Sequence, residues 1–234
     1  MPSNRRIRTP RTPRTAAAAV AAAAAVLTLL PATAAHAAPA PQPVATAPVP
    51  ATVASANASA PGGNAVFLGL DYATWQRDVA AVVDAARPAI EQRIAASPAG
   101  EKPAIVLDID NSSLETDFHW FWTSPTPAIE KVRALTQYAN QHGVAIFFVT
   151  ARPGIIYSLT ERNLKAVGYP VTGLYVRDLP ALFTEVSAYK TAKRAEIEAR
   201  GYTIIANIGN NESDLVGGHA ERTVKLPDYG GKLS

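Results

Sequence analysis

From Asn64 to the end of the chain, stretches whose apolar residues have helical spacing alternate with short apolar runs typical of buried strands. Between Tyr72 and about residue 96, apolar side chains recur every three or four positions, which predicts an amphipathic helix that Pro88 kinks or divides. After residue 100, short runs of branched apolar residues alternate with further amphipathic stretches. The runs predict strands at 104–109, 144–149, 173–176, 202–208 and 223–226, and the stretches predict helices at 127–141, 154–166, 186–200 and 213–220.

Strands that alternate with helices along the chain predict an α/β fold. The expected architecture is a Rossmann-like, mostly parallel sheet flanked by helices on both faces and preceded by the N-terminal helical segment. The gap between Thr116 and Pro127 is too short to hold a large cap domain. A site at the edge of this sheet is therefore expected to be fairly open.

Polar residues follow three of the predicted strands at their carboxyl ends. Asp108 and Asp110 end the first strand, Thr150 and Arg152 follow the second, and residues 210–214 follow the strand at 202–208. Ligands of such sheets bind beyond the carboxyl ends of the strands. We therefore expect these polar residues to converge on one crevice.

The chemistry of this crevice follows from its residue types. Buried carboxylates need a cation, a proton or a chemical role, and the simpler alternative is that the pair caps an exposed turn. Asp108 and Asp110 can share a divalent cation with Asp214, and oxygen ligands without Cys or His favour Mg²⁺. With the Thr150 hydroxyl and a lysine, such a site suits a phosphoryl group. One aspartate attacks phosphorus while its neighbour protonates the leaving oxygen.

The first 63 residues have a different composition from the rest. The arginines within 5–14, the apolar stretch 16–30 and the small residues at 35–37 predict a secretory signal peptide over 1–37, with an uncleaved anchor as the alternative. Residues 38–63, rich in Ala and Pro and without charge, predict a flexible linker, and 64–234 the folded domain. We expect a secreted protein that is not stably inserted in a membrane once the signal peptide is removed. The sequence does not decide between the general and the twin-arginine export route.

Charge and cysteine usage narrow the possible partners. Removal of residues 1–37 takes away five arginines and no acid, so the formal charge of +3 becomes −2. No Lys/Arg run remains, so nucleic acid is not an expected partner. The chain has no cysteine and its four histidines are scattered, which disfavours structural zinc. The expected partner is a small phosphomonoester, and the oligomeric state stays open.

Four short motifs resemble those of the haloacid dehalogenase (HAD) superfamily: DIDNS at 108–112, VTARP at 149–153, YK at 189–190 and IGNNESDL at 208–215. Their order and wording are similar to those of secreted, subfamily IIIB-like acid phosphatases related to plant acid phosphatases and vegetative storage proteins. The resemblance covers the whole domain, including the closing AERTVKLPDY. It implies a Mg²⁺-dependent phosphomonoesterase.

The resemblance also implies a role for each matched residue. Asp108 would be the nucleophile that forms an aspartyl-phosphate, and Asp110 would be the general acid/base. Both would also bind the metal, Asp110 through its backbone carbonyl. Thr150 would bind phosphate oxygens. Lys190 would neutralise the phosphate and Asp108, and Asp214 would hold the metal directly or through water.

Several positions depart from the family's usual residues or leave a choice open. Lys193, three residues after Lys190, is a rival for the lysine role. Ser112 stands where the family usually has threonine, and its hydroxyl can still orient the substrate-binding loop. Asn210 stands where the family usually has an aspartate that binds the metal. Its carbonyl oxygen carries no charge, which predicts weaker Mg²⁺ binding.

Three further residues are candidates for binding substrate. Arg152 anchors the substrate or simply pairs with a surface acid. His119 and Trp120 belong to the sequence HWFW at 119–122. This cluster either lines a pocket for the leaving group or packs over the end of the sheet.

Functions of two other kinds compete with the phosphomonoesterase. A catalytically weak or inactive binding or storage protein would keep the fold, and Asn210 is the feature in its favour. A phosphotransferase would use the same catalytic residues and differ only in the acceptor that its pocket admits.

Overall fold

The computed structural model describes residues 69–233. The predicted signal peptide and linker lie outside these residues. The first described element, α2 (Tyr72–Ala95), begins at Asp71, whose carboxylate accepts a hydrogen bond from the Thr74 N–H at 2.8 Å. The helix continues through Pro88. Of the two alternatives expected for this proline, a kink or a division, division of the helix is therefore wrong. Burial of the apolar face on both sides of the proline stabilises the continuous helix.

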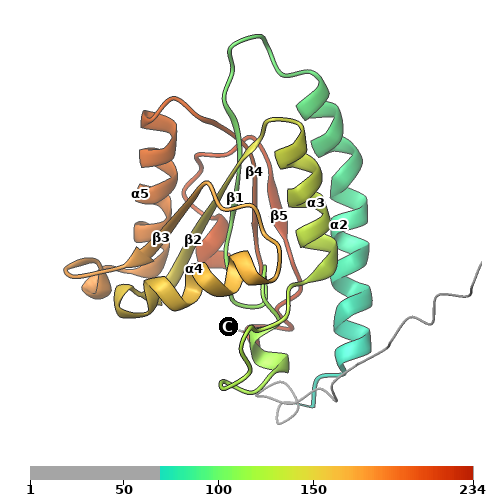
Figure 1. Ribbon diagram of the computed structural model, residues 1–234, viewed down its shortest axis with the longest axis vertical. Coiled ribbons are helices and arrows are strands. Elements are labelled where there is room, and N and C mark those ends of the chain that lie inside the picture. The colour runs from blue at the N-terminus through green and yellow to red at the C-terminus, as the bar shows by residue number, and fades with distance from the viewer. Residues whose placement is uncertain (1–68, 234) are drawn as a thin grey trace, which may run out of the picture. The chain divides into compact units, whose positions relative to one another are not determined.

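Five parallel strands form a single sheet. They are β1 (Pro103–Leu107), β2 (Ala145–Pro153), β3 (Gly173–Arg177), β4 (Thr203–Gly209) and β5 (Thr223–Lys225), in the spatial order β3-β2-β1-β4-β5 (Figure 1). The central strand β1 lies between β2 and β4, with Ala104 opposite both Ala145 and Ile204. This topology confirms the predicted α/β, Rossmann-like class.

Helices link successive strands, as parallel pairing requires. They are α3 (Glu130–Gln141), α4 (Tyr157–Ala166), α5 (Val186–Ala199) and the short α6 (Glu212–Leu215), with single 3₁₀ turns at Thr116–Phe118, Gly154–Ile156 and Ala181–Phe183. No cap domain lies between β1 and α3. Among the helices within residues 69–233, none is long and apolar enough to cross a membrane.

The last helix is much shorter than the sequence predicts. Residues 213–220 were expected to be helical, but α6 ends at Leu215. Gly217 and Gly218 follow with φ of 88° and 76°. This left-handed backbone, which glycine adopts easily, cannot continue a right-handed helix.

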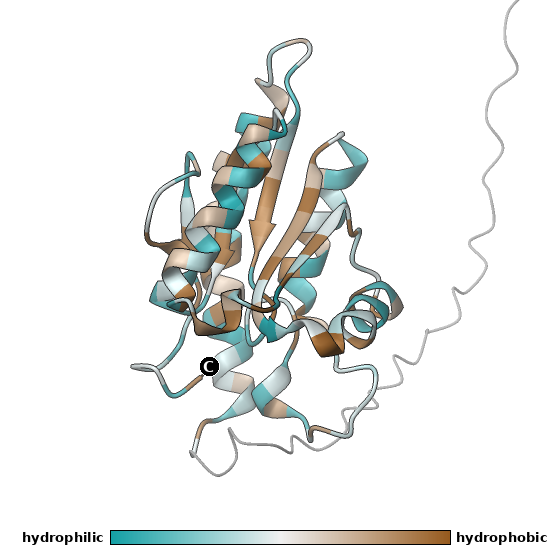
Figure 2. Ribbon diagram, turned by 90° about the vertical axis from the view of Figure 1, so that its left-hand side faces the viewer, coloured by the Kyte–Doolittle hydropathy of each residue, from teal (hydrophilic) through white to brown (hydrophobic). Residues whose placement is uncertain are grey.

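Alternate residues of β1 face two separate hydrophobic cores. Ile105 and Leu107 pack in the larger core with the apolar faces of α2 and α3, whereas Ala104 and Val106 pack in the smaller core with α5. Both cores are closed, so β1 is buried at every position. Figure 2 shows the hydrophobic strands enclosed between these helices. Burial on both faces explains why β1 reads as a continuous apolar run.

The interior proline of α2 yields a stability prediction. Pro88→Ala is expected to raise the free energy of unfolding by about 1–3 kcal/mol, because Pro88 is exposed and an interior proline cannot donate a hydrogen bond to the carbonyl of residue 84. Thermal and urea unfolding would measure this. The matched control is Pro98→Ala, just beyond the helix, which should leave stability unchanged or slightly lower it. A destabilised Pro88→Ala variant would contradict the prediction.

Candidate active site

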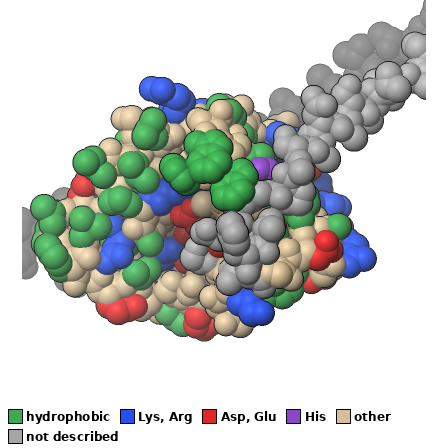
Figure 3. Space-filling model, turned by 90° about the horizontal axis from the view of Figure 1, so that it is seen from below, with side chains coloured by type: hydrophobic (Ala, Val, Ile, Leu, Met, Phe, Trp, Pro, Cys, Tyr) green, Lys and Arg blue, Asp and Glu red, His purple; other side chains and the backbone are tan. Residues whose placement is uncertain are grey.

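The polar residues that follow β1 and β4, and those in the last part of β2, lie at one edge of the sheet, because these strands are adjacent and parallel. Figure 3 views the protein from this edge and shows acidic and basic side chains gathered between hydrophobic ones. The Asp108 N–H donates to the Ile208 carbonyl at 3.0 Å, which continues the pairing of β1 with β4 by one residue. This bond places Asp108 next to the end of β4.

The turn after β1 is held by its own backbone. The N–H groups of Ser113 and Leu114 both donate to the Ile109 carbonyl at 2.9 Å. Asn111 occupies the left-handed region with φ of 53°, which asparagine tolerates better than most residues. The Ser113 hydroxyl donates to the carbonyl of Asp108 at 2.6 Å. These bonds fix the backbone on either side of Asp110.

Asp108, Lys190 and Asp214 form a buried ionic cluster. Lys190 Nζ donates to Asp108 Oδ1 at 2.6 Å and to Asp214 Oδ1 at 2.5 Å. All three residues are at most 6% exposed. Lys193 instead pairs with Glu196 and lies over the rings of Tyr175 and Tyr189. The structure therefore places Lys190, and not Lys193, beside Asp108.

One ammonium serves two carboxylates in this cluster, so it carries excess negative charge. Burial, opposed by Lys190 and reinforced by Asp214 and Asp110, raises the pKa of Asp108 from 3.8 to about 7. Burial works against the charged form of Lys190, but Asp108 and Asp214 outweigh it and raise the pKa of the lysine. A further cation or a proton is needed to neutralise the cluster.

Asp214 is held in place by the loop that follows β4. Its Oδ2 accepts the Asn211 N–H at 2.8 Å, and the Asn211 side chain caps α6 in return. A Cβ atom at Gly209 would lie 2.4 Å from the Cβ of Asp214. Glycine at position 209 is therefore required for this close approach.

Arg194 is a structural residue that sequence reasoning missed. It is 1% exposed, and its guanidinium donates to the carbonyls of Asp214 at 2.6 Å and of Gly218 at 2.9 Å, as well as to that of Val216. These three bonds fix the loop that carries Asp214. The only signal in the sequence was that Arg194 lies one helical turn after Lys190 on α5.

Asp110 points away from the ionic cluster toward Arg152. Arg152 Nε donates to Asp110 Oδ2 at 3.0 Å and Nη2 donates to Oδ1 at 2.7 Å, a bidentate pair. The Arg152 N–H donates to Thr150 Oγ1 at 3.1 Å. Thr150 is fully buried at the end of β2. Arg152 thus connects the predicted acid to the predicted phosphate-binding threonine.

Ser112 and Asn210 are bound to each other. The Ser112 hydroxyl donates to Asn210 Oδ1 at 2.9 Å and accepts the Asn210 N–H at 2.8 Å. Both side chains are fully buried. The amide oxygen of Asn210 thus uses one of its two lone pairs on Ser112.

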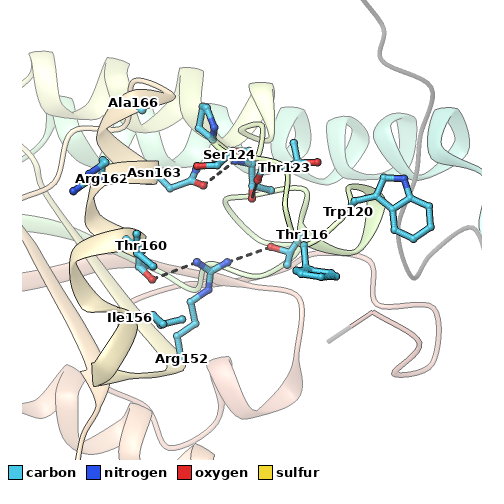
Figure 4. Close-up of a pocket in the computed structure, with 14 residues that line it drawn as sticks. Thr116, Trp120, Thr123, Ser124, Arg152, Ile156, Thr160, Arg162, Asn163 and Ala166 are labelled. Atoms are coloured by element: carbon cyan, nitrogen blue, oxygen red, sulfur yellow. Dashed lines mark hydrogen bonds between the residues drawn. The ribbon is translucent and has the colours of Figure 1, made fainter.

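The HWFW sequence divides between two environments. His119 Nε2 lies 2.8 Å from Glu115 Oε2, and the same carboxylate accepts the Tyr72 hydroxyl of α2 at 2.8 Å. This contact ties the start of α2 to the loop after β1. Trp120 instead lines a pocket of about 490 Å³ next to Arg152, and His119 is not among the residues that line it (Figure 4).

The cluster offers a limited set of ligands for a metal ion. Within residues 69–233 no group of three or more His, Cys, Asp or Glu side chains is arranged to hold a metal. Asp108 and Asp214 are the two carboxylates of the cluster, and the buried Asn210, directly after β4, offers a neutral amide oxygen. The excess negative charge nevertheless fits a divalent cation bound through oxygen atoms.

A Rossmann-like sheet with two aspartates on the turn after β1, a buried lysine and a third aspartate from α6 defines the class of the protein as a HAD-type α/β fold. The chain belongs to the HAD superfamily, subfamily IIIB (acid phosphatase), whose family model matches residues 40–232.

Curated plant proteins and solved bacterial structures are similar to this chain. The 28 kDa and 31 kDa stem glycoproteins of Glycine max are each 41% identical over 123 residues, half of this chain and 47% and 41% of their own lengths. Vegetative storage protein 1 of Arabidopsis thaliana is 29% identical over 114 residues, 47% of this chain and 42% of its own. The chain thus matches less than half of each of these relatives.

The solved structures support the fold. The class C acid phosphatase of Bacillus anthracis with tungstate bound superposes with a TM-score of 0.56 at 18% identity, over 70% of this chain and 82% of that one. A second structure of that enzyme gives 0.54 over 68% and 80%.

The charge excess of the cluster yields a prediction about stability and pH. Asp108→Asn should stabilise the metal-free protein above pH 7 by an amount on the order of 2–4 kcal/mol. The folded-state pKa of about 7 exceeds the usual 3.8, so wild-type stability falls as pH rises between these values. The variant avoids this loss, and Lys190 keeps Asp214 as its partner.

Thermal unfolding in EDTA from pH 4 to pH 8 would measure this difference. The stabilisation should be small at pH 4 and grow toward pH 7. Asp84→Asn, which removes an exposed ion pair with Lys131, is the control and should change stability by less than about 1 kcal/mol. An Asp108→Asn variant that is less stable than wild type at pH 8 would refute the prediction.

Proposed function

We propose that the protein is a phosphomonoesterase that works through an aspartyl-phosphate on Asp108. The observation that carries the proposal is the contact between Lys190 Nζ and Asp108 Oδ1 at the end of β1, in a chain that belongs to an acid phosphatase subfamily. A carboxylate held beside an ammonium at a strand end is placed to receive a phosphoryl group whose charge the ammonium offsets.

In the first step an oxygen of Asp108 attacks phosphorus and the bond from phosphorus to the leaving oxygen breaks. Lys190 orients Asp108 and attracts the negative oxygens of the phosphoryl group. Thr150, which already accepts the Arg152 N–H, has its own hydroxyl proton to donate to one of these oxygens. The aspartyl-phosphate and the leaving group are the products of this step.

Asp110 supplies the proton for the leaving oxygen. It lies two residues after Asp108 on the same turn, and its pairing with Arg152 fixes its orientation. In the second step Asp110 takes a proton from water, whose oxygen attacks phosphorus and releases Asp108 and inorganic phosphate. An alcohol in place of water would make the reaction a phosphotransfer.

The cofactor proposed for this site is Mg²⁺. Asp108 and Asp214 would hold it with their carboxylates, Asp110 with its backbone carbonyl, and Asn210 with the remaining lone pair of its amide oxygen. When bound, the cation would stabilise negative charge on the phosphoryl group. Ser112 holds the Asn210 side chain in place through their reciprocal hydrogen bonds.

We also propose that the domain of residues 64–234 acts outside the cell, after removal of residues 1–37 and with 38–63 as a linker. The composition of the N-terminal segment supports this. The names of the relatives, which are stem glycoproteins and a vegetative storage protein, are consistent with export.

A storage or binding protein is the second candidate. Two observations favour it: the similarity to vegetative storage protein 1 and the neutral Asn210 in place of an acidic ligand. Storage alone does not require the buried pairing of Asp108 with Lys190, since the removal of Asp108 from water costs stability at neutral pH that Lys190 only partly offsets. The catalytic reading accounts for this pairing, and the storage reading does not.

Hydrolysis of p-nitrophenyl phosphate by the secreted form of the protein tests the proposal. Activity should require Mg²⁺, disappear in EDTA and fall at least about 10³-fold in Asp108→Asn, since the nucleophile is lost. Lys190→Met should cause a comparable loss, whereas Lys193→Met, the matched control on the same helix, should retain activity within about twofold. Circular dichroism would verify that each variant folds. A folded wild-type protein without activity at any pH would favour the storage reading.

The neutral residue in the proposed metal site yields a further prediction. Asn210→Asp should tighten Mg²⁺ binding by about tenfold or more, because an anionic oxygen replaces a neutral one and can still accept the Ser112 hydroxyl. Isothermal titration calorimetry with Mg²⁺ would measure the dissociation constant. Asn211→Asp, the adjacent residue that caps α6, is the matched control and should have a smaller effect. Equal tightening in both variants would show that only general charge is involved.

A further inference from the structure

Arg152 has hydrogen-bonding capacity beyond its pairing with Asp110. A guanidinium has five N–H donors. The edge formed by Nε and Nη2 serves Asp110, while Nη1 and Nη2 reach Thr160 and Thr116 only at 3.4 and 3.5 Å. Figure 4 shows the guanidinium between these two threonines, within the pocket of about 490 Å³. One N–H group of Nη1, and the two N–H groups that make only these long contacts, are thus available to a ligand.

The charge of the pocket favours an anion. Its lining includes two arginines, Arg152 and Arg162, and no aspartate or glutamate. Asp110, beside the pocket, neutralises only one of them. Apolar and uncharged polar side chains, among them Thr116, Trp120 and Thr160, make up the remainder of the lining.

The pocket adjoins the leaving-group side of the proposed reaction. Arg152 contacts Asp110, the residue proposed to protonate the leaving oxygen. Its backbone N–H also holds Thr150, the residue proposed to bind the phosphoryl oxygens. A group that enters the pocket while its phosphate lies at Asp108 is therefore the alcohol portion of the ester. A volume of about 490 Å³ is within the range of small-molecule sites.

We propose that this pocket selects phosphomonoesters whose leaving group carries a second anionic group, such as a carboxylate, and that Arg152 binds this group through Nη1. The inference rests on the proposed phosphatase function and names its substrate class. Arg152 thereby has two roles: one edge of its guanidinium positions Asp110, and the other determines specificity.

Five aryl phosphates test the proposal: phenyl phosphate, the 3- and 4-isomers of carboxyphenyl phosphate, and the methyl ester of each isomer. The ester matches the acid in shape but lacks the charge. It also has the better phenol leaving group, so intrinsic reactivity works against the expected preference. The wild-type protein should show a kcat/KM for one acid isomer at least about tenfold above that for its ester.

Substitution of Arg152 should remove this preference. In Arg152→Gln the ratio of kcat/KM between acid and ester should fall to about 1 or below, since the ester has the better leaving group, and Arg152→Lys, which keeps the charge but not the fork, should give an intermediate value. Lys165→Gln, an exposed residue of α4 paired with Glu161, controls for general charge and should retain the wild-type ratio. A preference that survives in Arg152→Gln overturns the proposal.

Binding measurements keep the proposal testable if Arg152→Gln loses all turnover. In an Asp108→Asn background, calorimetry should show the acid binding at least about tenfold tighter than the ester, and the double variant with Arg152→Gln should lose this difference. Wild-type hydrolysis of phenyl phosphate without any preference for the acid would overturn the specificity and leave the phosphatase intact. Absence of all hydrolysis would overturn the phosphatase, and the binding ratio would still decide whether Arg152 recognises an anion.

Discussion

The contact of two buried carboxylates with one buried ammonium is the interaction on which the site depends. Asp108 directly follows β1, Asp214 lies in α6 just after β4, and Lys190 comes from α5. Ions removed from water are stabilised only if their partners are held in good geometry. The surrounding structure provides this geometry, but the cluster retains one negative charge in excess. Burial, together with that excess, raises the pKa of Asp108, and the excess charge is compatible with a bound cation.

Several polar contacts hold the cluster in position. Arg194 fixes the loop after β4 through three backbone carbonyls, and Gly209 lets Asp214 approach β4 closely. Ser112 and Asn210 join the turn after β1 to the end of β4 across the centre of the sheet. The site is therefore built where β1 and β4 meet, and α5 holds it through Lys190 and Arg194.

The two aspartates of the turn after β1 lie in different environments. Asp108 faces the buried cluster, whereas Asp110 faces the partly open pocket through Arg152. This separation suits a nucleophile that must be shielded and an acid that must reach a leaving group. Because no cap domain covers the sheet between β1 and α3, the loop containing Trp120, together with α4, forms the wall of the pocket.

The sequence by itself determined the elements and the strand ends that carry the chemistry. Apolar periodicity located all five strands within a few residues, and the polar residues after them identified Asp108 and Asp214 as neighbours, which both contact Lys190. These signals are local, since they depend on burial and backbone preference within one element. The tertiary structure decided what local signals cannot: that Lys190 rather than Lys193 meets Asp108, 82 residues away, and that Arg152 binds Asp110. It also revealed Arg194 and kept α2 continuous through Pro88. Such outcomes depend on which helix face packs against which strand, a property of the assembled core and not of any single segment.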